Sequence, residues 1–408
     1  MLGTTQKWPI DRTWPIEEIV LHVGFTVTTA LVPQASPASP DQFDSVLQLL
    51  QKINLSVNDG KQPRSVVDST GIGLLEYCQK VGLNLDEPTQ RVSAMVSPQV
   101  GSEGTNAAAL GLQVGCYEMT YRIPMVHPWI GEPLRTRMYL PAHIYPQDPV
   151  LSLTFQSAAN MYSSGVIGAI YVDVELIRRV PTAASESVLQ KSAGSNPNGY
   201  IDWDLIETPF GIAPGLSGEQ RFPLPIPGAY TDLVFRQYLG GSPVTRSPID
   251  ASGIGNTVAL GFGAETRWRL ESGLVVIREW RWKHLRALND FSSPFMPVEF
   301  AETLSSGTLT RYSLQTGNIG AGAQMAMSGG VVTNFRSAVS SCFNFLSDGL
   351  SGDNCIELGS VLDCNTPANN GLKMELIGSV ASVATNGSQL SVIGRRLFGN
   401  LSRWQKFA

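Results

Sequence analysis

Short stretches in which apolar and polar residues alternate recur along the chain and predict β-strands. In Ile53–Val57, Val150–Phe155 and Ile170–Leu176 alternate positions are apolar, which puts a row of apolar side chains on one face of an extended backbone. That is the pattern of a half-buried strand, because successive side chains of a strand point to opposite faces of the sheet. Such stretches lie on both sides of a small, polar segment, Pro181–Gly199. The pattern predicts an all-β protein built of two β-sandwiches.

The same pattern predicts further strands in both parts of the chain. They cover residues 14–27, 44–57, 112–123, 134–140, 150–155 and 166–177 in the first part, and 200–206, 230–239, 266–270, 274–284, 309–314, 331–335, 355–362, 372–377 and 380–383 in the second. Asn58-Asp59-Gly60 is a strong turn signal. A short helix is predicted to follow the capping residues Asp68–Thr70 and to end near Gly82.

Length and composition support two domains. The chain has 408 residues, more than the roughly 250–300 at which a single core stops growing. The 40 glycines and 26 prolines suit a fold with many tight turns and few long helices. We therefore predict a first sandwich over residues 1–180, a linker over 181–199, and a second sandwich with a C-terminal tail over 200–408.

The low charge content bears on the partners of the protein. Charged residues make up 15% of the chain, well below the roughly 25% of an ordinary soluble domain. Part of the surface is therefore predicted to be buried against other chains. The formal net charge of −5 argues against electrostatic binding of nucleic acid, so no specific nucleic-acid partner is predicted.

The sequence offers no pattern typical of an enzyme. It has no GxSxG nucleophile elbow, Gly215–Gly218 being the nearest approach, and no GxxxxGK[ST] phosphate loop. The glycine pairs at 253–255, 261–263 and 320–322 lack the strand-then-helix context of dinucleotide binding. We predict no catalytic residues, no cofactor and no metal site, and hence no enzymatic activity.

The residues that could bind a metal are scattered. The four histidines, which never form an HxH or HExxH pattern, are His22, His127, His143 and His284. A structural role is the better interpretation for such lone histidines. Asp202 and Asp204 flank Trp203, so on a strand both carboxylates would project from one face. They could bind calcium or share a proton, although two outward-facing acids on a surface strand explain them equally well.

The cysteines and the N-terminus bear on the cellular compartment. The five cysteines form no CxxC pair and are odd in number, which favours free thiols over a zinc site or a disulfide framework; they are Cys78, Cys116, Cys342, Cys355 and Cys364. Residues Met1–Lys7 lack the layout of a secretion signal, and no stretch reaches the length of a membrane span. Synthesis in the cytoplasm is predicted, and a sequon at Asn386–Ser388 is then without consequence.

Two stretches combine basic and aromatic residues. In Arg278–His284, Trp280 and Trp282 share one face of a predicted strand, which would allow base stacking, although one buried and one solvated face is the better interpretation in an acidic chain. The stretch Ile393–Phe407 contains four basic and five large apolar residues. It could contact a membrane surface or a neighbouring subunit, or it could pack on its own domain.

With two β-sandwiches predicted, several segments resemble those of a viral protein family. The segments in the first part are Leu50–Gly60, Asp68–Gly82 as an inserted helix, Pro124–Trp129, and Ala169–Arg178 as the closing strand of a barrel. Those in the second part are Phe222–Tyr230, Arg236–Gly241, Leu288–Ser292 and Glu357–Asp363. Together they resemble the double jelly-roll major capsid proteins of tailless, icosahedral, internal-membrane bacteriophages, of the tectivirus and corticovirus type and the PRD1–adenovirus lineage.

The resemblance implies a structural protein of the virion. It implies two eight-stranded jelly rolls side by side, with short helices in loops, and homotrimers of pseudo-hexagonal outline that build an icosahedral shell over a membrane. Its partners would be neighbouring capsid trimers, a vertex (penton) protein and, at the periphery, the internal viral membrane. Two other functions stay open: a carbohydrate-binding or receptor-binding β-sandwich protein, and a bicupin-type metalloenzyme, which would need clustered metal ligands.

Overall fold

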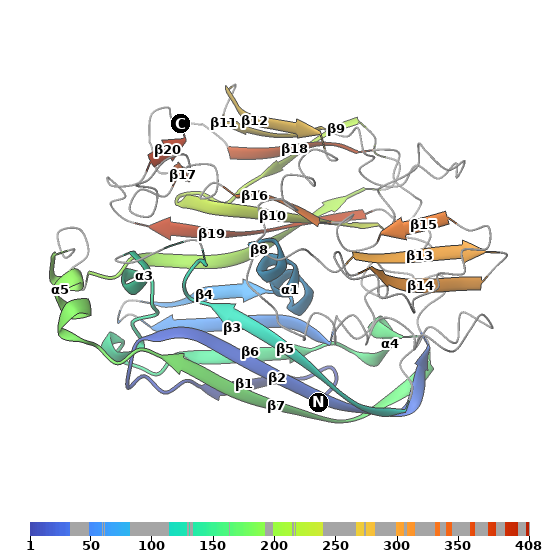
Figure 1. Ribbon diagram of the computed structural model, residues 1–408, viewed down its shortest axis with the longest axis horizontal. Helices are drawn as coiled ribbons and strands as arrows, with labels where there is room; N and C mark the ends of the chain where they lie inside the picture. The colour runs from blue at the N-terminus through green and yellow to red at the C-terminus, as the bar shows by residue number, and fades with distance from the viewer. Residues whose placement is uncertain are drawn as a thin grey trace.

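The fold is described from a computed structural model of the whole chain (Figure 1). The structure describes residues 1–32, 49–58, 60, 62–81, 114–128, 130, 134–162, 164–191, 199–213, 216, 218–239, 267–272, 275–281, 299–305, 308–314, 331–334, 340–344, 360–363, 374–380, 388–398 and 405–407. All structural statements below concern these residues.

The first part of the chain, up to residue 191, contains seven strands and several short helices among the described residues. The strands are β1 (Thr5–Pro9), β2 (Ile16–Val32), β3 (Leu50–Asn58), β4 (Pro63–Ser69), β5 (Gly115–Pro124), β6 (Val150–Phe155) and β7 (Ser164–Arg178). The helices are α1 (Gly71–Lys80), α3 (Leu134–Arg137), the 3-10 turn η3 (Ala142–Ile144), α4 (Ala158–Met161) and α5 (Ala183–Lys191).

The second part, from residue 199 onward, is made of strands wherever the structure describes regular elements. They are β8 (Asp202–Ile212), β9 (Gly218–Pro223), β10 (Ala229–Leu239), β11 (Arg267–Ser272), β12 (Val275–Arg281), β13 (Glu299–Ser305), β14 (Thr308–Leu314), β15 (Val331–Asn334), β16 (Ser340–Asn344), β17 (Ser360–Asp363), β18 (Met374–Val380), β19 (Ser388–Phe398) and β20 (Gln405–Phe407). We call the two parts the first half and the second half.

One ten-stranded sheet runs through both halves. Its order is β1-β6-β3-β4-β8-β19-β10-β17-β20, with β16 also paired to β10. The halves meet where β4 pairs with β8 in parallel, and this pairing covers only Val67 with Leu205 and Asp68 with Ile206. All other pairings in the sheet are antiparallel except that of β17 with β20. The hydrogen-bonded backbone pairing between the halves is therefore short.

Each half adds a second, outer sheet to its part of this long sheet. The first half adds β5-β2-β7 and the second adds β12-β11-β18-β9, while β14-β13-β15 form a separate small sheet. Alternation explains the packing: along β6 the residues Leu151, Leu153 and Phe155 are buried, and the residues between them are not. Apolar residues of the two sheets face each other and exclude water, which is the main stabilising term of a sandwich.

The two cores differ in extent among the described residues. The core of the first half joins β2 and β5 to β3 and β6 and continues through α1 to Val234, Cys342 and Ile393 of the second half. The core of the second half is smaller and centres on the fully buried Trp268, whose ring lies 4.8 Å from that of Phe235 and 6.3 Å from that of Phe222. Packing is therefore continuous where the halves meet.

Most of the strands predicted from alternation are present. The predicted strand at 150–155 is β6, that at 166–177 is β7, and the predicted helix after Asp68–Thr70 is α1. Thr70 caps α1, since its hydroxyl accepts a hydrogen bond from the backbone N–H of Gly73 at 2.9 Å. Residues 44–48 of one predicted strand and 355–359 of another lie outside the described residues.

The strand predicted at 134–140 is wrong. Residues Leu134–Arg137 form the short helix α3, because tertiary contacts override a weak alternating pattern here. The Arg135 guanidinium donates to Glu17 at 2.5 Å, and the Arg137 Nε donates to the carbonyl of Gly199 at 2.9 Å. The neighbouring Met138, Tyr139 and Leu140 are all buried, so no face of this stretch is left to solvent as alternation would require.

The predicted linker, Pro181–Gly199, contains the helix α5. Its side chains are exposed or half-buried, and it lies beside α3 at one end of the molecule (Figure 1). The N-terminus of α5 is capped by a reciprocal pair of hydrogen bonds. Ser185 N–H donates to the Thr182 hydroxyl at 3.2 Å, and Thr182 N–H donates to the Ser185 hydroxyl at 2.8 Å. Residues 192–198 lie outside the described part of the chain.

The predicted C-terminal tail is also corrected. Residues 393–398 are the end of β19, a central strand hydrogen-bonded to β8 on one side and β10 on the other. Ile393 and Leu397 belong to the core, and Arg395 is fully buried. The stretch from 393 to 398 therefore follows the alternative in which it packs on its own domain, since Arg395 is enclosed by partners of its own chain, and it is part of a core strand rather than a tail. Residues 399–404 are outside the described part.

Candidate functional site

The joint between the halves carries the densest set of buried polar contacts among the described residues. We use "the joint" for the β4–β8 pairing together with α1, the residues from Pro124 to His127, and the facing parts of β8, β10 and β19. Figure 1 shows α1 near the centre of the molecule, where strands of both halves surround it. Side chains that reach across from one half to the other compensate for the short backbone pairing.

Glu207 of β8 binds the start of α1. One of its carboxylate oxygens accepts hydrogen bonds from the Thr70 N–H at 2.6 Å, the Thr70 hydroxyl at 2.9 Å and the Ser69 hydroxyl at 2.9 Å. The other accepts a hydrogen bond from Ser391 of β19. A carboxylate at a helix N-terminus is stabilised by the free N–H groups of the first turn. A residue of the second half thus completes the cap of a helix in the first half.

Arg395 and Asp232 of the second half meet Tyr77 of α1 in the buried interior. The Tyr77 hydroxyl donates to the Asp232 carboxylate at 3.2 Å and accepts from the Arg395 Nε at 3.3 Å. The three side chains are fully buried. The two terminal nitrogens of Arg395 donate to the carbonyls of Pro124 and Met125, each at 2.6 Å. The arginine therefore satisfies the backbone at the end of β5 from across the joint.

Two other contacts fix the position of Arg395. Its guanidinium lies 4.6 Å from the centre of the Trp203 ring, within the range of a cation–π contact. The Trp203 indole N–H in turn donates to the carbonyl of Met138 at 2.8 Å. Hydrogen-bond acceptors for its N–H groups and a π face against the guanidinium are what allow an arginine to be buried at acceptable cost.

His127 completes this cluster. Its Nε2 lies 3.3 Å from the Asp232 carboxylate, and both side chains have no exposed surface. Burial lowers the pKa of His127, and the nearby Asp232 only partly opposes that effect, while the positive charge of Arg395 adds to it. The same burial raises the pKa of the adjacent Cys78 to about 12, so this thiol is uncharged and inert.

The paired aspartates, for which the sequence left a calcium or proton site and two surface acids open as alternatives, are parts of ion pairs. Asp202 pairs with Arg64 of β4, again across the joint. Asp204 accepts two hydrogen bonds from the Arg396 guanidinium, at 2.9 and 2.5 Å. Burial raises the pKa of Asp204, and the arginine opposes that shift. Because each carboxylate already has a guanidinium partner, the structure gives this pair a structural role.

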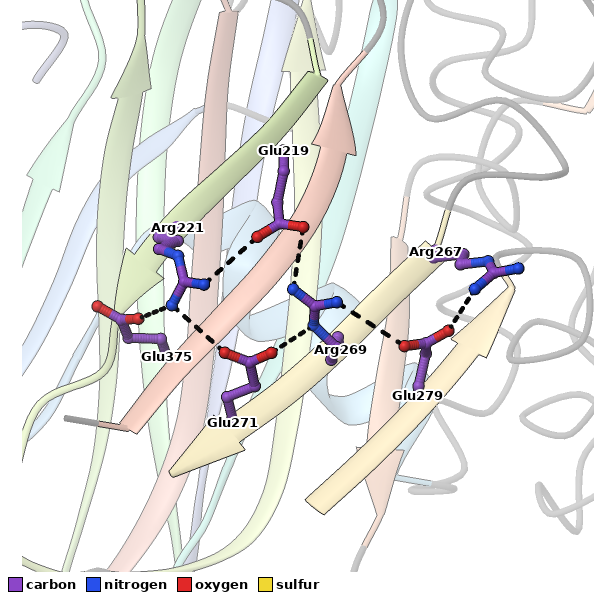
Figure 2. Close-up of polar contacts among 7 residues, drawn as sticks. All are labelled: Glu219, Arg221, Arg267, Arg269, Glu271, Glu279 and Glu375. Carbon is purple, nitrogen blue, oxygen red and sulfur yellow. Dashed lines mark hydrogen bonds and ion pairs between the residues drawn. The ribbon is translucent and has the colours of Figure 1, made fainter. Parts of the chain in front are cut away.

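The outer face of the second half is covered by alternating charges. Four glutamates and three arginines from β9, β18, β11 and β12 form one network (Figure 2). Arg269 lies within 2.9 Å of Glu219, 2.6 Å of Glu271 and 4.0 Å of Glu279. Further pairs join Arg221 to Glu219, Glu271 and Glu375, and Arg267 to Glu279. Every charge in the network has an opposite neighbour, so the face has little net field for capturing an ionic ligand.

The basic and aromatic stretch Arg278–His284 is only partly described. Trp280 is partly buried and packs against the second core, which favours the interpretation of one buried face and leaves this ring poorly placed for stacking on a base. Trp268 lies opposite Trp280 on the neighbouring strand β11. Trp282, Lys283 and His284 lie outside the described residues, as do the glycine pairs at 253–255, 261–263 and 320–322.

The remaining candidate residues are separate in space. His22 lies on the outer face of β2 between Glu118, at 3.2 Å, and Glu175, at 3.6 Å, and His143 packs edge-on against Tyr200. Among the described residues, no three His, Cys, Asp or Glu side chains are grouped so as to hold a metal ion. Of the five cysteines the structure describes three, all free thiols; Cys355 and Cys364 lie outside the described part. In the described part no helix is long and apolar enough to cross a membrane.

Comparison with known proteins finds solved structures of similar fold but no similar sequence. No family model and no curated protein sequence matches the chain. Solved structures do: the STIV MCP is 15% identical, and the match covers 99% of this chain and 94% of that one at a TM-score of 0.50. The PBCV-1 virus capsid, in its quasi-atomic model, is 10% identical, with 98% and 90% covered and a TM-score of 0.50.

These likenesses establish the fold. The chain is an all-β protein of the double jelly-roll type, as the resemblance in the sequence implied. Sequence reasoning missed the joint itself, because Tyr77, His127, Asp232 and Arg395 are widely separated along the chain and form no motif.

Proposed function

We propose that this protein is a major capsid protein, the repeating structural unit of an icosahedral virion shell. The observation that carries the proposal is the similarity of fold to the STIV MCP and the PBCV-1 capsid over almost the entire length of both chains. A binding module inserted in a larger enzyme would match over only part of its length. In this proposal the protein has no enzymatic activity, needs no cofactor, and resides in the virion after synthesis in the host cytoplasm.

We propose a homotrimer as the assembling unit. Two similar sandwiches in each chain and three chains in each ring give six comparable contacts around one axis, which suits a pseudo-hexagonal tile. The low charge content of 15% favours large apolar contacts between chains. Neighbouring trimers, a vertex protein and the periphery of an internal membrane are the further partners in this proposal.

The domain division proposed here is residues 1–180, 181–199 and 200–408. The exposed helix α5 within the middle segment supports a connecting role for it. The network of the joint supports the view that the two sandwiches act as one rigid block. A rigid block is what a shell needs, since load is then passed between neighbours with little deformation inside each chain.

The test is assembly of the purified full-length chain. Light scattering coupled to size exclusion, at micromolar concentration and physiological salt, should give three times the chain mass, and electron microscopy should show particles with a hexagonal outline. A protein that stays monomeric under these conditions and gives no such particles would overturn the proposal. Metal analysis and glycan binding on the same sample separate the two alternatives: stoichiometric metal favours the bicupin, and specific glycan capture favours the carbohydrate-binding protein.

A further inference from the structure

The joint contains a fully buried histidine among other ionisable groups. We propose that the cluster of Tyr77, His127, Asp232 and Arg395 is a proton-sensitive clasp, which holds the two halves together at neutral pH and loosens in mild acid. This inference does not depend on the proposed function, because it concerns the contact between the halves of a single chain.

The geometry makes the clasp a single unit. Tyr77 comes from α1, His127 from the segment after β5, Asp232 from β10 and Arg395 from β19, and all four side chains have no exposed surface. Two belong to each half. The chain of contacts runs from His127 to Asp232 at 3.3 Å, to Tyr77 at 3.2 Å, to Arg395 at 3.3 Å, and back to the carbonyl of Met125 at 2.6 Å. A change of charge at His127 therefore alters the electrostatic energy of every contact in the clasp.

Histidine is the member of the cluster that titrates in mild acid. Its ordinary pKa is about 6.5, whereas tyrosine and arginine lose protons only above about 10 and aspartate gains one only near 4. The charged and titratable groups packed around it are Tyr77 and Cys78 on α1, Asp232 on β10 and Arg395 on β19, with the Glu18–Arg122 pair beside Cys78. Asp232 favours a charged His127, and Arg395 opposes it.

The direction of the effect follows from burial. In the closed clasp the pKa of His127 is lowered, chiefly by burial. When the clasp opens, water reaches the ring and the pKa returns toward its ordinary value. The open state therefore binds a proton that the closed state does not, so opening becomes easier as the pH falls below about 6.5 and stays unaffected above it. As the pH falls, the equilibrium constant for opening keeps rising until the pH reaches the lowered pKa of His127 in the closed state.

The joint is the place where this opening should occur. Its backbone contributes only two residue pairs, between β4 and β8, whereas β2 and β7 within the first half are paired over most of their length. The hydrogen bonds of Arg395 are accepted by the carbonyls of Pro124 and Met125, three and two residues before His127 in the chain. Local opening proceeds where few backbone hydrogen bonds have to break.

Hydrogen exchange of the full-length protein tests the proposal. Exchange rates of α1 (71–80) and of the β4–β8 pairing (residues 67–68 and 205–206) are measured at pH 7.5 and pH 5.5 and corrected for the intrinsic pH dependence of exchange. We expect the equilibrium constant for opening in these two segments to be larger at pH 5.5, by up to about tenfold, which is the limit for one proton bound with a pKa of about 6.5 in the open state only. Residues 16–32 of β2 serve as the internal reference and should not change.

Two variants identify the histidine responsible. His127→Gln removes the titrating group and should abolish the pH-dependent ratio, whatever its effect on the opening constant at pH 7.5. His143→Gln is the matched control, because burial also lowers the pKa of His143 but its ring lies against Tyr200 and outside the clasp. This variant should keep the ratio of opening constants, pH 5.5 over pH 7.5, that the unmodified protein shows. A ratio that persists in His127→Gln, or one that is equally large in β2, would overturn the proposal.

A measurement on the unmodified protein covers the case in which His127→Gln does not fold. Histidine ring signals followed by NMR between pH 7.5 and 5 should show one fully buried ring that does not titrate with a pKa near 6.5 while the protein stays folded. Titration near 6.5 of every ring except that of His143, whose pKa burial also lowers, without any change in the exchange of α1 and the β4–β8 pairing would overturn the clasp.

Discussion

Two regions of this molecule, the outer sheet of the second half and the joint, place their charged residues differently. In the second half, seven charged side chains cover the outer sheet and pair with one another on the surface (Figure 2). In the joint, by contrast, Asp232, Arg395 and His127 are withdrawn from solvent completely. Surface pairs contribute little to stability, whereas a buried charge without its partners is costly. The difference shows that the number of ion pairs says little about what holds the halves together.

The outer sheets of the two halves also differ in how they use an aromatic ring over a glycine. In the first half Tyr171 covers Gly24 on the outer face, and this tyrosine is 53% exposed. In the second half Trp268 covers Gly378 on the inner face and is fully buried. The glycine is needed at both positions because a Cβ would lie within 3 Å of the ring. Only the first ring has solvent to move into.

Large aromatic side chains at the centre of each core give the largest expected effects. Phe25→Ala in the first core and Trp268→Ala in the second should each lower the free energy of unfolding by about 3–5 kcal/mol, measured by denaturant titration. Both side chains are fully buried. If the joint makes the halves one cooperative unit, each substitution will lower hydrogen-exchange protection in both halves. Loss of protection confined to the substituted half would show that the halves unfold independently.

Removal of the buried arginine comes next. Arg395→Met keeps much of the side-chain volume but leaves the carbonyls of Pro124 and Met125 without their donors. We expect a loss of about 3 kcal/mol in the free energy of unfolding, the usual cost of buried polar groups left unsatisfied. Arg267→Met is the control, since this arginine is mostly exposed and pairs only with Glu279 among the described residues. Equal effects of the two substitutions would contradict the distinction between joint and surface.

The sequence was sufficient to predict the strands but not the joint. Alternation over Val150–Phe155 and Ile170–Leu176 identified β6 and β7 because each strand has one buried and one exposed face. The same reasoning left open whether the segment from 393 to 398 contacts another surface or packs on its own domain; in the structure it is the end of β19, and Arg395 is fully buried there. Its burial depends on acceptors in Pro124 and Met125, about 270 residues away in the chain, and local patterns carry no information about such distant partners.

The aspartates show the same limit. The sequence placed Asp202 and Asp204 on one strand and left a binding site and a surface position open as alternatives. What decides between them is the position of Arg64 and Arg396, which comes from the pairing of β4 and β19 with β8. Periodicity predicts the direction of a side chain relative to its own strand, while the neighbour that it meets is determined by the topology of the sheet.

The two aromatic-covered glycines offer a matched pair with a moderate effect. Gly378→Ala places a methyl group 2.6 Å from the enclosed Trp268 ring, and overpacking of this kind costs about 1–3 kcal/mol. Gly24→Ala meets the Tyr171 ring even more closely, at 1.9 Å, yet that ring can rotate into solvent, so we expect a loss below about 1 kcal/mol. Thermal and denaturant unfolding of the two variants should rank them in this order, and the reverse order would refute the difference between the faces.

The smallest effect is expected on the charged outer face. Arg269 is the centre of that network, with three glutamates around it, and Arg269→Met removes all three contacts while keeping the aliphatic stem. Because Arg269 and two of its three partners, Glu219 and Glu279, are at least a quarter exposed, and only Glu271 is largely buried, we expect a loss of about 1 kcal/mol or less at low salt. Screening should reduce the difference from the unmodified protein further in 1 M NaCl, where the Debye length is about 3 Å. The stabilities of both proteins are compared by denaturant unfolding at the two salt concentrations. A loss as large as that of Arg395→Met, or one that salt does not reduce, would show that the outer network contributes to stability in the same way as the buried joint.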